Sequence, residues 1–138
     1  MLYTITMFYA GLLGLIFLIL SFRVVKLRRS LGVGLGTGES EDLERAVRAQ
    51  ANFCEYVPLA LVLILLIEAS AAVPAWLVHA LGIGLLAGRV LHGLFGLNLS
   101  AGTSIGRFWG TALTWLVIGF SALVAIGMAV GRWLFLAL

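Results

Sequence analysis

Four long stretches of the sequence contain no Asp, Glu, Lys or Arg, and they limit what this chain can fold into more than any other feature. These stretches are Leu2–Phe22, Tyr56–Ile67, Ala69–Gly88 and Phe108–Gly131. A helix needs about 20 largely apolar residues to cross the hydrocarbon core of a bilayer. Three stretches reach that length alone, and the second reaches it when its helix is extended through Asn52 and Glu55. We therefore expect four membrane-spanning helices.

The composition agrees with a membrane location, since 62% of the residues are hydrophobic and 11% are charged, against about 25% charged in soluble domains. The expected fold is an all-α membrane protein whose residues 1–138 form one four-helix transmembrane bundle. The expected spans cover approximately residues 2–27, 41–68, 74–97 and 104–132. Basic residues follow the first stretch and none precedes it, so this stretch is expected to be a retained span rather than a signal peptide.

The positions of Lys and Arg predict how the chain is oriented. Between the first and second spans they stand at Arg23, Lys26, Arg28, Arg29, Arg45 and Arg48. Arg107 lies between the third and fourth spans, whereas the turn around residues 69–74 has no basic residue. Basic loops stay in the cytoplasm, so we expect the first and third connections there and both termini on the opposite side. Arg132 is the one residue that opposes this assignment.

The segment "LGVGLGTGES" precedes the second span and contains glycine at positions 32, 34, 36 and 38. A flexible connector is the favoured interpretation. A phosphate-binding loop is the alternative, but such a loop follows a strand, and here a membrane helix precedes it. Ser40 is the expected N-cap of the second helix, with acidic residues in the first turn. Two ion pairs are expected at i,i+4 spacing, Glu41–Arg45 and Glu44–Arg48.

A polar stripe runs along the second helix where it enters the membrane. At 100° per residue, Glu44, Arg48, Asn52 and Glu55 fall within roughly 80° of arc and extend about 16 Å along the axis. A charge at mid-bilayer costs at least ~2.5–3.5 kcal/mol. The stripe is therefore expected to face protein, water or a polar ligand.

The third and fourth helices place further polar residues at the same expected depth. Arg89 and His92 are three residues apart near the end of the third helix, and Arg107 opens the fourth. Two interpretations remain open at this point. A salt-bridge network between helices is common in membrane proteins. The excess of arginine over carboxylate instead favours an anionic ligand held by guanidinium groups.

The segment "ERAVRAQANFCEYVPLAL" resembles the second-helix signature of the membrane-associated proteins in eicosanoid and glutathione metabolism, the MAPEG family. That signature, Glu-Arg-x-x-Arg-x-x-x-Asn-x-x-Glu followed by proline, is matched at Glu44, Arg45, Arg48, Asn52, Glu55 and Pro58. "GRVLH" resembles the third-helix motif, and Arg107 resembles the arginine that heads the last span. The resemblance covers the whole chain and is closest to a bacterial-type member.

This resemblance implies a homotrimer of four-helix subunits in a bacterial inner membrane, with glutathione bound between neighbouring subunits near the cytoplasmic face. It implies glutathione-binding roles for Glu44, Arg45, Arg48, Asn52, Glu55, Arg89 and His92. It assigns the catalytic role to Arg107, which would stabilise the glutathione thiolate. The implied reactions are transfer of glutathione to lipophilic electrophiles, reduction of lipid hydroperoxides, or both.

Two other functions are compatible with a small four-span membrane protein. A non-catalytic scaffold or ligand-binding protein that retains the glutathione site remains the alternative. A small proton-coupled exporter is disfavoured, since the first span contains no acidic residue. No second histidine or carboxylate stands at metal-ligand spacing from His79, so no metal site is expected. Cys54 is expected to be a small buried residue. No nucleic-acid partner is expected.

Overall fold

The computed structural model of the chain describes residues 3–97 and 104–136, and helices are the only regular secondary structure in those residues. The helices are α1 (Thr4–Leu31), α2 (Glu41–Ala69), α3 (Ala75–Arg89) and α4 (Ile105–Leu136). A π-helical segment, η1 (Val90–Leu97), continues α3 without a break. Four helices are long and apolar enough to cross a membrane, α3 and η1 counting as one. The predicted all-α, four-helix architecture is therefore confirmed.

The observed helices extend beyond some of the expected spans. Helix α1 continues to Leu31 and α4 to Leu136, four residues past the expected limits in each case. Helix α1 ends at Gly32, whose positive φ of 67° suits glycine and whose amide donates to the carbonyl of Arg28. The expected start of the first span at residue 2 lies outside the described residues, as does most of the expected connector between the third and fourth spans.

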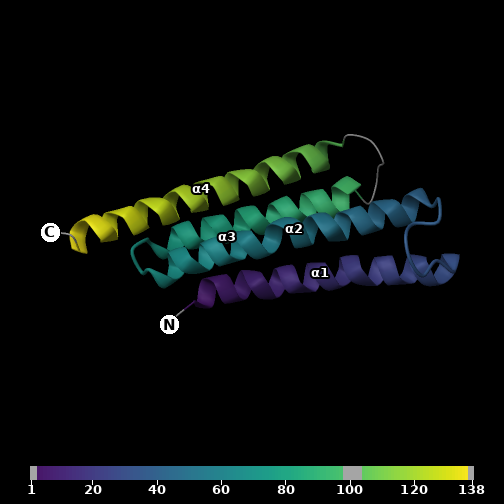
Figure 1. Cartoon of the computed structure of the whole chain (residues 1–138), viewed down its shortest axis with the longest axis horizontal. Helices are drawn as coiled ribbons and strands as arrows, with labels where there is room; N and C mark the ends of the chain where they lie inside the picture. Colours follow the sequence, from purple (N-terminus) through teal and green to yellow (C-terminus); the bar gives the residue numbers. More distant parts are fainter. Residues whose placement is uncertain (1–2, 98–103, 137–138) are drawn as a thin grey trace.

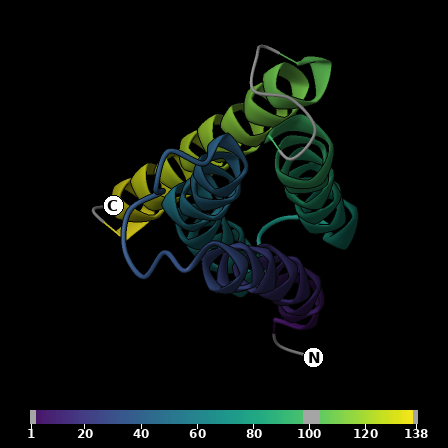
Figure 2. The ribbon, with the colours of Figure 1, turned by 90° about the vertical axis from the view of Figure 1, so that its right-hand side faces the viewer.

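The helices run antiparallel along one long axis (Figure 1), and the end-on view shows them grouped as a bundle (Figure 2). Helix α1 packs on α2 and α3, while α4 packs on α2, α3 and η1. The α1–α2 connector, the end of η1 and the start of α4 lie at one end of the bundle (Figure 1). We call this the connector end. Helix α1 begins and α4 ends at the other end.

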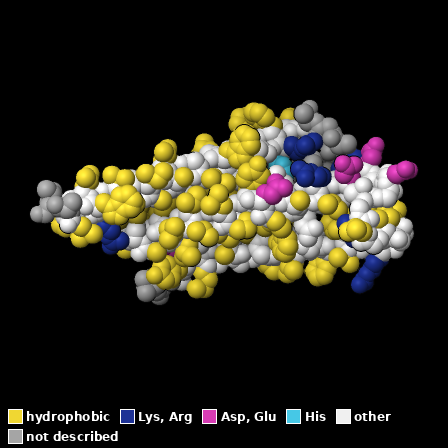
Figure 3. Space-filling view, in the orientation of Figure 1, with side chains coloured by type: hydrophobic (Ala, Val, Ile, Leu, Met, Phe, Trp, Pro, Cys, Tyr) yellow, Lys and Arg dark blue, Asp and Glu magenta, His cyan; other side chains and the backbone are white. Residues whose placement is uncertain are grey.

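Apolar side chains fill the interior and also cover the outside. The largest fully buried apolar side chains are Leu13, Leu20, Leu43, Ile64, Ile67 and Leu85. Figure 3 shows hydrophobic side chains over most of the visible face, with charged side chains gathered mainly toward the connector end. Exposed Phe22, Trp76 and Trp115 belong to this outer surface. Because a soluble protein seldom exposes so large an apolar area, the surface fits a lipid environment.

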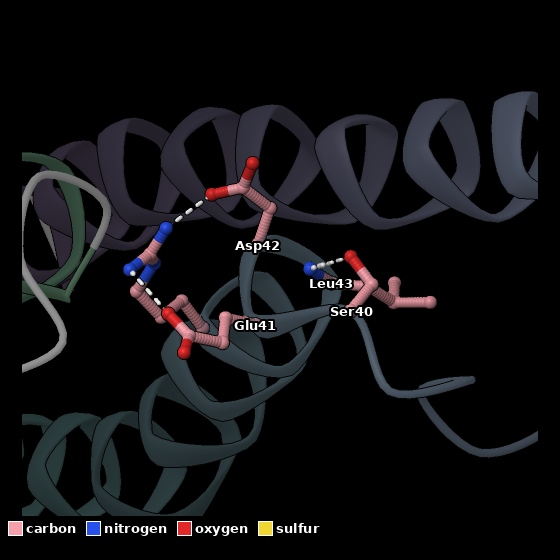
Figure 4. Close-up of polar contacts among 5 residues, drawn as sticks. Ser40, Glu41, Asp42 and Leu43 are labelled. Atoms are coloured by element: carbon pink, nitrogen blue, oxygen red, sulfur yellow. Dashed lines mark hydrogen bonds and ion pairs between the residues drawn. The ribbon is translucent and has the colours of Figure 1, made fainter.

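The start of α2 is capped as the sequence predicts. The Ser40 hydroxyl accepts a hydrogen bond from the Leu43 amide at 3.3 Å (Figure 4). Arg45 pairs with both Glu41, at 3.6 Å, and Asp42 (Figure 4). The expected Glu44–Arg48 pair is not among the ion pairs of the described residues. Local sequence spacing allows that second pair but does not fix the rotamers that would form it.

The opposite end of the bundle holds a cap that joins two helices. The Glu68 carboxylate, at the end of α2, accepts hydrogen bonds from the amides of Ile5 at 3.0 Å and Thr6 at 2.8 Å. These amides are among the unpaired donors of the first turn of α1. The carboxylate therefore takes the place of a local N-cap side chain, which Tyr3 does not supply.

Candidate functional site

Glycines bring α3 and η1 into backbone contact with α4 near the connector end. A Cβ atom placed on Gly88 would lie 2.8 Å from the Thr114 hydroxyl and 3.1 Å from the Gly110 carbonyl. A Cβ on Gly96 would lie 2.9 Å from the backbone nitrogen of Arg107. Small residues at such positions let membrane helices approach closely. This close approach places the third- and fourth-helix polar residues next to one another.

The change from α-helix to π-helix occurs immediately after Arg89, between the two polar residues of the third helix. Arg89 is the last residue of α3, and His92 is the third residue of η1. A π-helical turn holds more residues than an α-helical turn and is frequent at functional sites. The spacing of Arg89 and His92 is therefore no longer the simple α-helical i,i+3 relation expected from the sequence. Both side chains are nevertheless buried.

Arg89 ties three helices together from inside the bundle, and its side chain is only 2% exposed. Its Nη1 donates to the Asn52 side-chain oxygen on α2 at 2.8 Å. Its Nη2 donates to the Gly110 carbonyl at 3.2 Å and to the Thr114 hydroxyl at 2.6 Å, both on α4. The guanidinium carbon also lies 5.6 Å from the centre of the Tyr56 ring, a cation–π contact.

These partners satisfy the hydrogen-bonding needs of Arg89 only in part and leave its charge unneutralised. The Nε atom is buried with no acceptor among the described residues. The recorded partners are an amide, a carbonyl, a hydroxyl and an aromatic ring, and no carboxylate of the described residues pairs with Arg89. A buried cation without a counter-ion is costly. It also makes the adjoining space favourable for an anion.

A pocket of about 460 Å³ lies beside this network, between α2, η1 and α4. Its polar lining consists of Asn52, His92, Ser104, Arg107 and Thr111. Its apolar wall consists of Phe108, Ala112 and Trp115 on α4. The polar groups come from three segments of the chain, α2, η1 and the start of α4. The apolar wall continues onto the outer surface of α4, where Phe108 and Trp115 are exposed. Such a pocket suits a ligand with a charged group that binds next to a second, apolar molecule.

The structure divides the predicted site residues into two groups. Asn52, His92 and Arg107 line the pocket. Arg89 is not part of the lining but donates a hydrogen bond to Asn52, which is. Four residues, Glu44, Arg45, Arg48 and Glu55, are not part of the pocket lining. Arg45 is held by its acidic neighbours, whereas Glu44, Arg48 and Glu55 are exposed and form no recorded hydrogen bond or ion pair within the described residues. The role of each in ligand binding remains a prediction.

Several residues of the site were missed by sequence reasoning. Thr114 and Gly110 accept hydrogen bonds from Arg89, and the Thr114 hydroxyl donates to the Gly110 carbonyl at 2.8 Å. A Gly-x-x-x-Thr spacing in an otherwise apolar span was the signal available for them. Tyr56 also belongs to the site, because its ring contacts the Arg89 guanidinium. Cys54, expected to be buried, is exposed, because the polar face of α2 turns outward beside it.

Comparison with known proteins adds family information to this geometry. A sequence model of the MAPEG family matches residues 6–127. Two curated relatives, both called inner membrane protein YecN, come from Escherichia coli K12 and Escherichia coli O6:H1. Each is 44% identical over 84 residues, which make up 61% of this chain and 63% of the relative. No solved structure matches the chain significantly.

Proposed function

The chain belongs to the MAPEG family, and from that premise we propose that it is a glutathione-dependent integral membrane enzyme. In this proposal it transfers glutathione to lipophilic electrophiles, reduces lipid hydroperoxides, or does both. The four candidate spans and the family make it an integral membrane protein. The ligand and the reaction are inferred from the pocket and from the family.

The observation that carries the proposal is the meeting of Asn52, His92 and Arg107 in one pocket beside the buried charge of Arg89. Glutathione carries two carboxylates, one ammonium group and a thiol. The pocket offers a guanidinium, an amide and hydroxyl groups to such a ligand, and its apolar wall offers contact for a lipophilic partner. A volume of about 460 Å³ falls within the usual range for small-molecule sites.

Arg107 is the proposed catalytic residue. A cysteine thiol has a pKa near 8.5 in water, and a neighbouring guanidinium favours the thiolate, which is the nucleophile. In transfer to an aryl halide, the thiolate sulfur forms a bond to the ring carbon, and halide leaves with the bonding electrons. In peroxide reduction, the sulfur attacks the terminal oxygen, the O–O bond breaks, and the alkoxide takes a proton to become an alcohol. A second glutathione then converts the sulfenic acid to a disulfide and water.

The outward face of α2 supports the proposed homotrimer. Glu44, Arg48 and Glu55 are exposed there, above the exposed apolar side chains of Leu59 and Val62. Charged groups facing lipid within a span are expensive. A neighbouring subunit that covers this face would remove the cost and bring Arg45, Arg48, Glu44 and Glu55 to the edge of a shared glutathione site.

The relatives point to the inner membrane as the location, since both are named inner membrane proteins. We propose the same membrane for this chain, with the first and third connections cytoplasmic. The connector end, which carries most of the charged side chains and the pocket, would then face the cytoplasm, where glutathione is supplied. A cysteine-accessibility experiment in spheroplasts tests this orientation, with single cysteines introduced at Leu35 or Ala72 in a Cys54→Ser background that removes the exposed native thiol. Labelling of a cysteine at position 35 by a membrane-impermeant reagent added outside the spheroplasts would contradict the proposed orientation.

The alternative is a non-catalytic scaffold that binds glutathione without activating it. The two residues after Arg107, Phe108 and Trp109, carry no hydroxyl or acidic group that could share in thiol chemistry. The two functions predict the same ligand but differ in the state of the thiol.

The deciding experiment uses the purified chain in detergent, glutathione, and a lipophilic aryl halide. The ultraviolet difference spectrum reports thiolate formation, isothermal titration reports binding, and product formation reports transfer. We expect binding, a thiolate signal, and loss of that signal in Arg107→Ala. Arg132→Ala, at the opposite end of the bundle, is the matched control. Binding without a thiolate signal favours the scaffold, and absence of binding refutes both functions.

A further inference from the structure

The contact between Arg89 and Asn52 determines which part of the Asn52 amide is available to a ligand. Asn52 has an acceptor oxygen and a donor NH2 group, and the two are hard to distinguish without knowing their partners. Arginine can only donate hydrogen bonds. The side-chain oxygen of Asn52 must therefore face Arg89 Nη1, which lies 2.8 Å from it.

The Asn52 NH2 group is consequently left for the pocket. Asn52 is half-buried and lines the pocket, and its nitrogen has no recorded partner within residues 3–97 and 104–136. The position of the Arg89 guanidinium is fixed, because its Nη2 donates hydrogen bonds to the Gly110 carbonyl and the Thr114 hydroxyl on α4. The asparagine is thus locked in the orientation that presents a donor.

We propose that Arg89 is a positioning residue that touches no ligand and that acts by fixing Asn52 as a hydrogen-bond donor to a carboxylate. This inference rests on the proposed function and adds to it the chemical group that the pocket recognises at this point. The buried positive charge of Arg89 also favours an anionic ligand. An anion bound next to the Asn52 amide lowers the electrostatic cost of burying the guanidinium group. The pocket therefore selects an acceptor-rich anionic group over a neutral or cationic one.

Replacement of Asn52 by aspartate separates this role from a structural one. Asn52→Asp keeps the size of the side chain and gives Arg89 a carboxylate partner, which none of the described residues supplies. It also replaces the donor that faces the pocket by a second acceptor. We expect the variant to unfold at a denaturant concentration no lower than that of the wild type. We expect its affinity for glutathione to fall by about 10- to 100-fold, because a charge-assisted hydrogen bond is exchanged for repulsion.

A double-mutant cycle identifies the route by which Arg89 acts. Arg89→Met removes the guanidinium group but keeps an unbranched apolar side chain, and Thr114 retains its own bond to the Gly110 carbonyl. If Arg89 acts through Asn52, the variants Asn52→Ala and Arg89→Met lose affinity non-additively, and the double variant binds no more weakly than the weaker single variant. Direct contact between Arg89 and the ligand instead predicts additive losses, and additivity would overturn the proposal.

The outcomes for this inference and for the proposed function can be told apart. Failure of the wild type to bind glutathione refutes the proposed function. The stability measurements test the contact between Arg89 and Asn52 without any ligand, because Asn52→Asp should be tolerated with Arg89 present and destabilising in the Arg89→Met background. Equal destabilisation in both backgrounds overturns the inference, as does an Asn52→Asp variant that binds glutathione as tightly as the wild type.

Discussion

Substitution of Gly110 by alanine tests whether backbone contact between the third and fourth helices holds the site together. A Cβ on Gly110 would lie 2.6 Å from the His92 amide nitrogen, 2.7 Å from the Gly88 carbonyl oxygen and 2.7 Å from the His92 Cβ. These distances are roughly 0.7–0.8 Å shorter than an ordinary contact of 3.4 Å. None of the three atoms belongs to the flexible end of a side chain. Helix α4 must therefore move away from α3 and η1.

The cost follows from this displacement. Overpacking of a tight interface costs about 1–3 kcal/mol. The same movement stretches the bond from Arg89 Nη2 to the Gly110 carbonyl, which starts at 3.2 Å, and weakening a hydrogen bond to a charged group adds about 1–2 kcal/mol. The higher helix propensity of alanine offsets about 1 kcal/mol of this destabilisation. The expected net loss for Gly110→Ala is about 1–4 kcal/mol.

The assay is unfolding in mixed micelles at increasing mole fraction of sodium dodecyl sulfate, followed by circular dichroism. Gly119→Ala is the matched control, because it lies on the same helix and a Cβ there meets nothing within 4 Å. The control should be unchanged or stabilised by up to about 1 kcal/mol. Equal stability of the two variants would refute the reasoning, since only the contacts to Gly88 and His92 distinguish them.

Three further predictions concern other contacts. Thr114→Val, which removes an acceptor from buried Arg89, should lower the free energy of unfolding by about 1–3 kcal/mol, and Thr114→Ser should restore most of it in the same titration. Glu68→Ala should lower the free energy of unfolding by about 0.5–2 kcal/mol, because it removes the acceptor of the Ile5 and Thr6 amides. Hydrogen exchange should become faster only at the start of α1, and unchanged slow exchange there would contradict the prediction. Arg45→Ala should lower the free energy of unfolding of the chain by less than about 1 kcal/mol, because its partners Glu41 and Asp42 are exposed, and a larger loss would contradict the weak contribution expected of these two ion pairs.

Much of this protein follows from local and periodic features of its sequence. The number of spans follows from the lengths of the uncharged stretches, because a bilayer demands about 20 apolar residues per crossing. The cap at Ser40 follows from hydrogen-bonding groups only three residues apart. Membership of the MAPEG family was visible in the second-helix signature from Glu44 to Pro58 and is supported by the family match.

Tertiary structure alone decided how the polar residues are used. The sequence places Arg89, Asn52 and Arg107 at one depth, but it does not say which side of each helix meets which neighbour. That choice depends on the glycine contacts that bring α4 against η1 and on the π-helical turns that alter the register after Arg89. The partners of Arg89 lie 21 to 37 residues away. Their distances and directions depend on packing between helices, which no local spacing specifies.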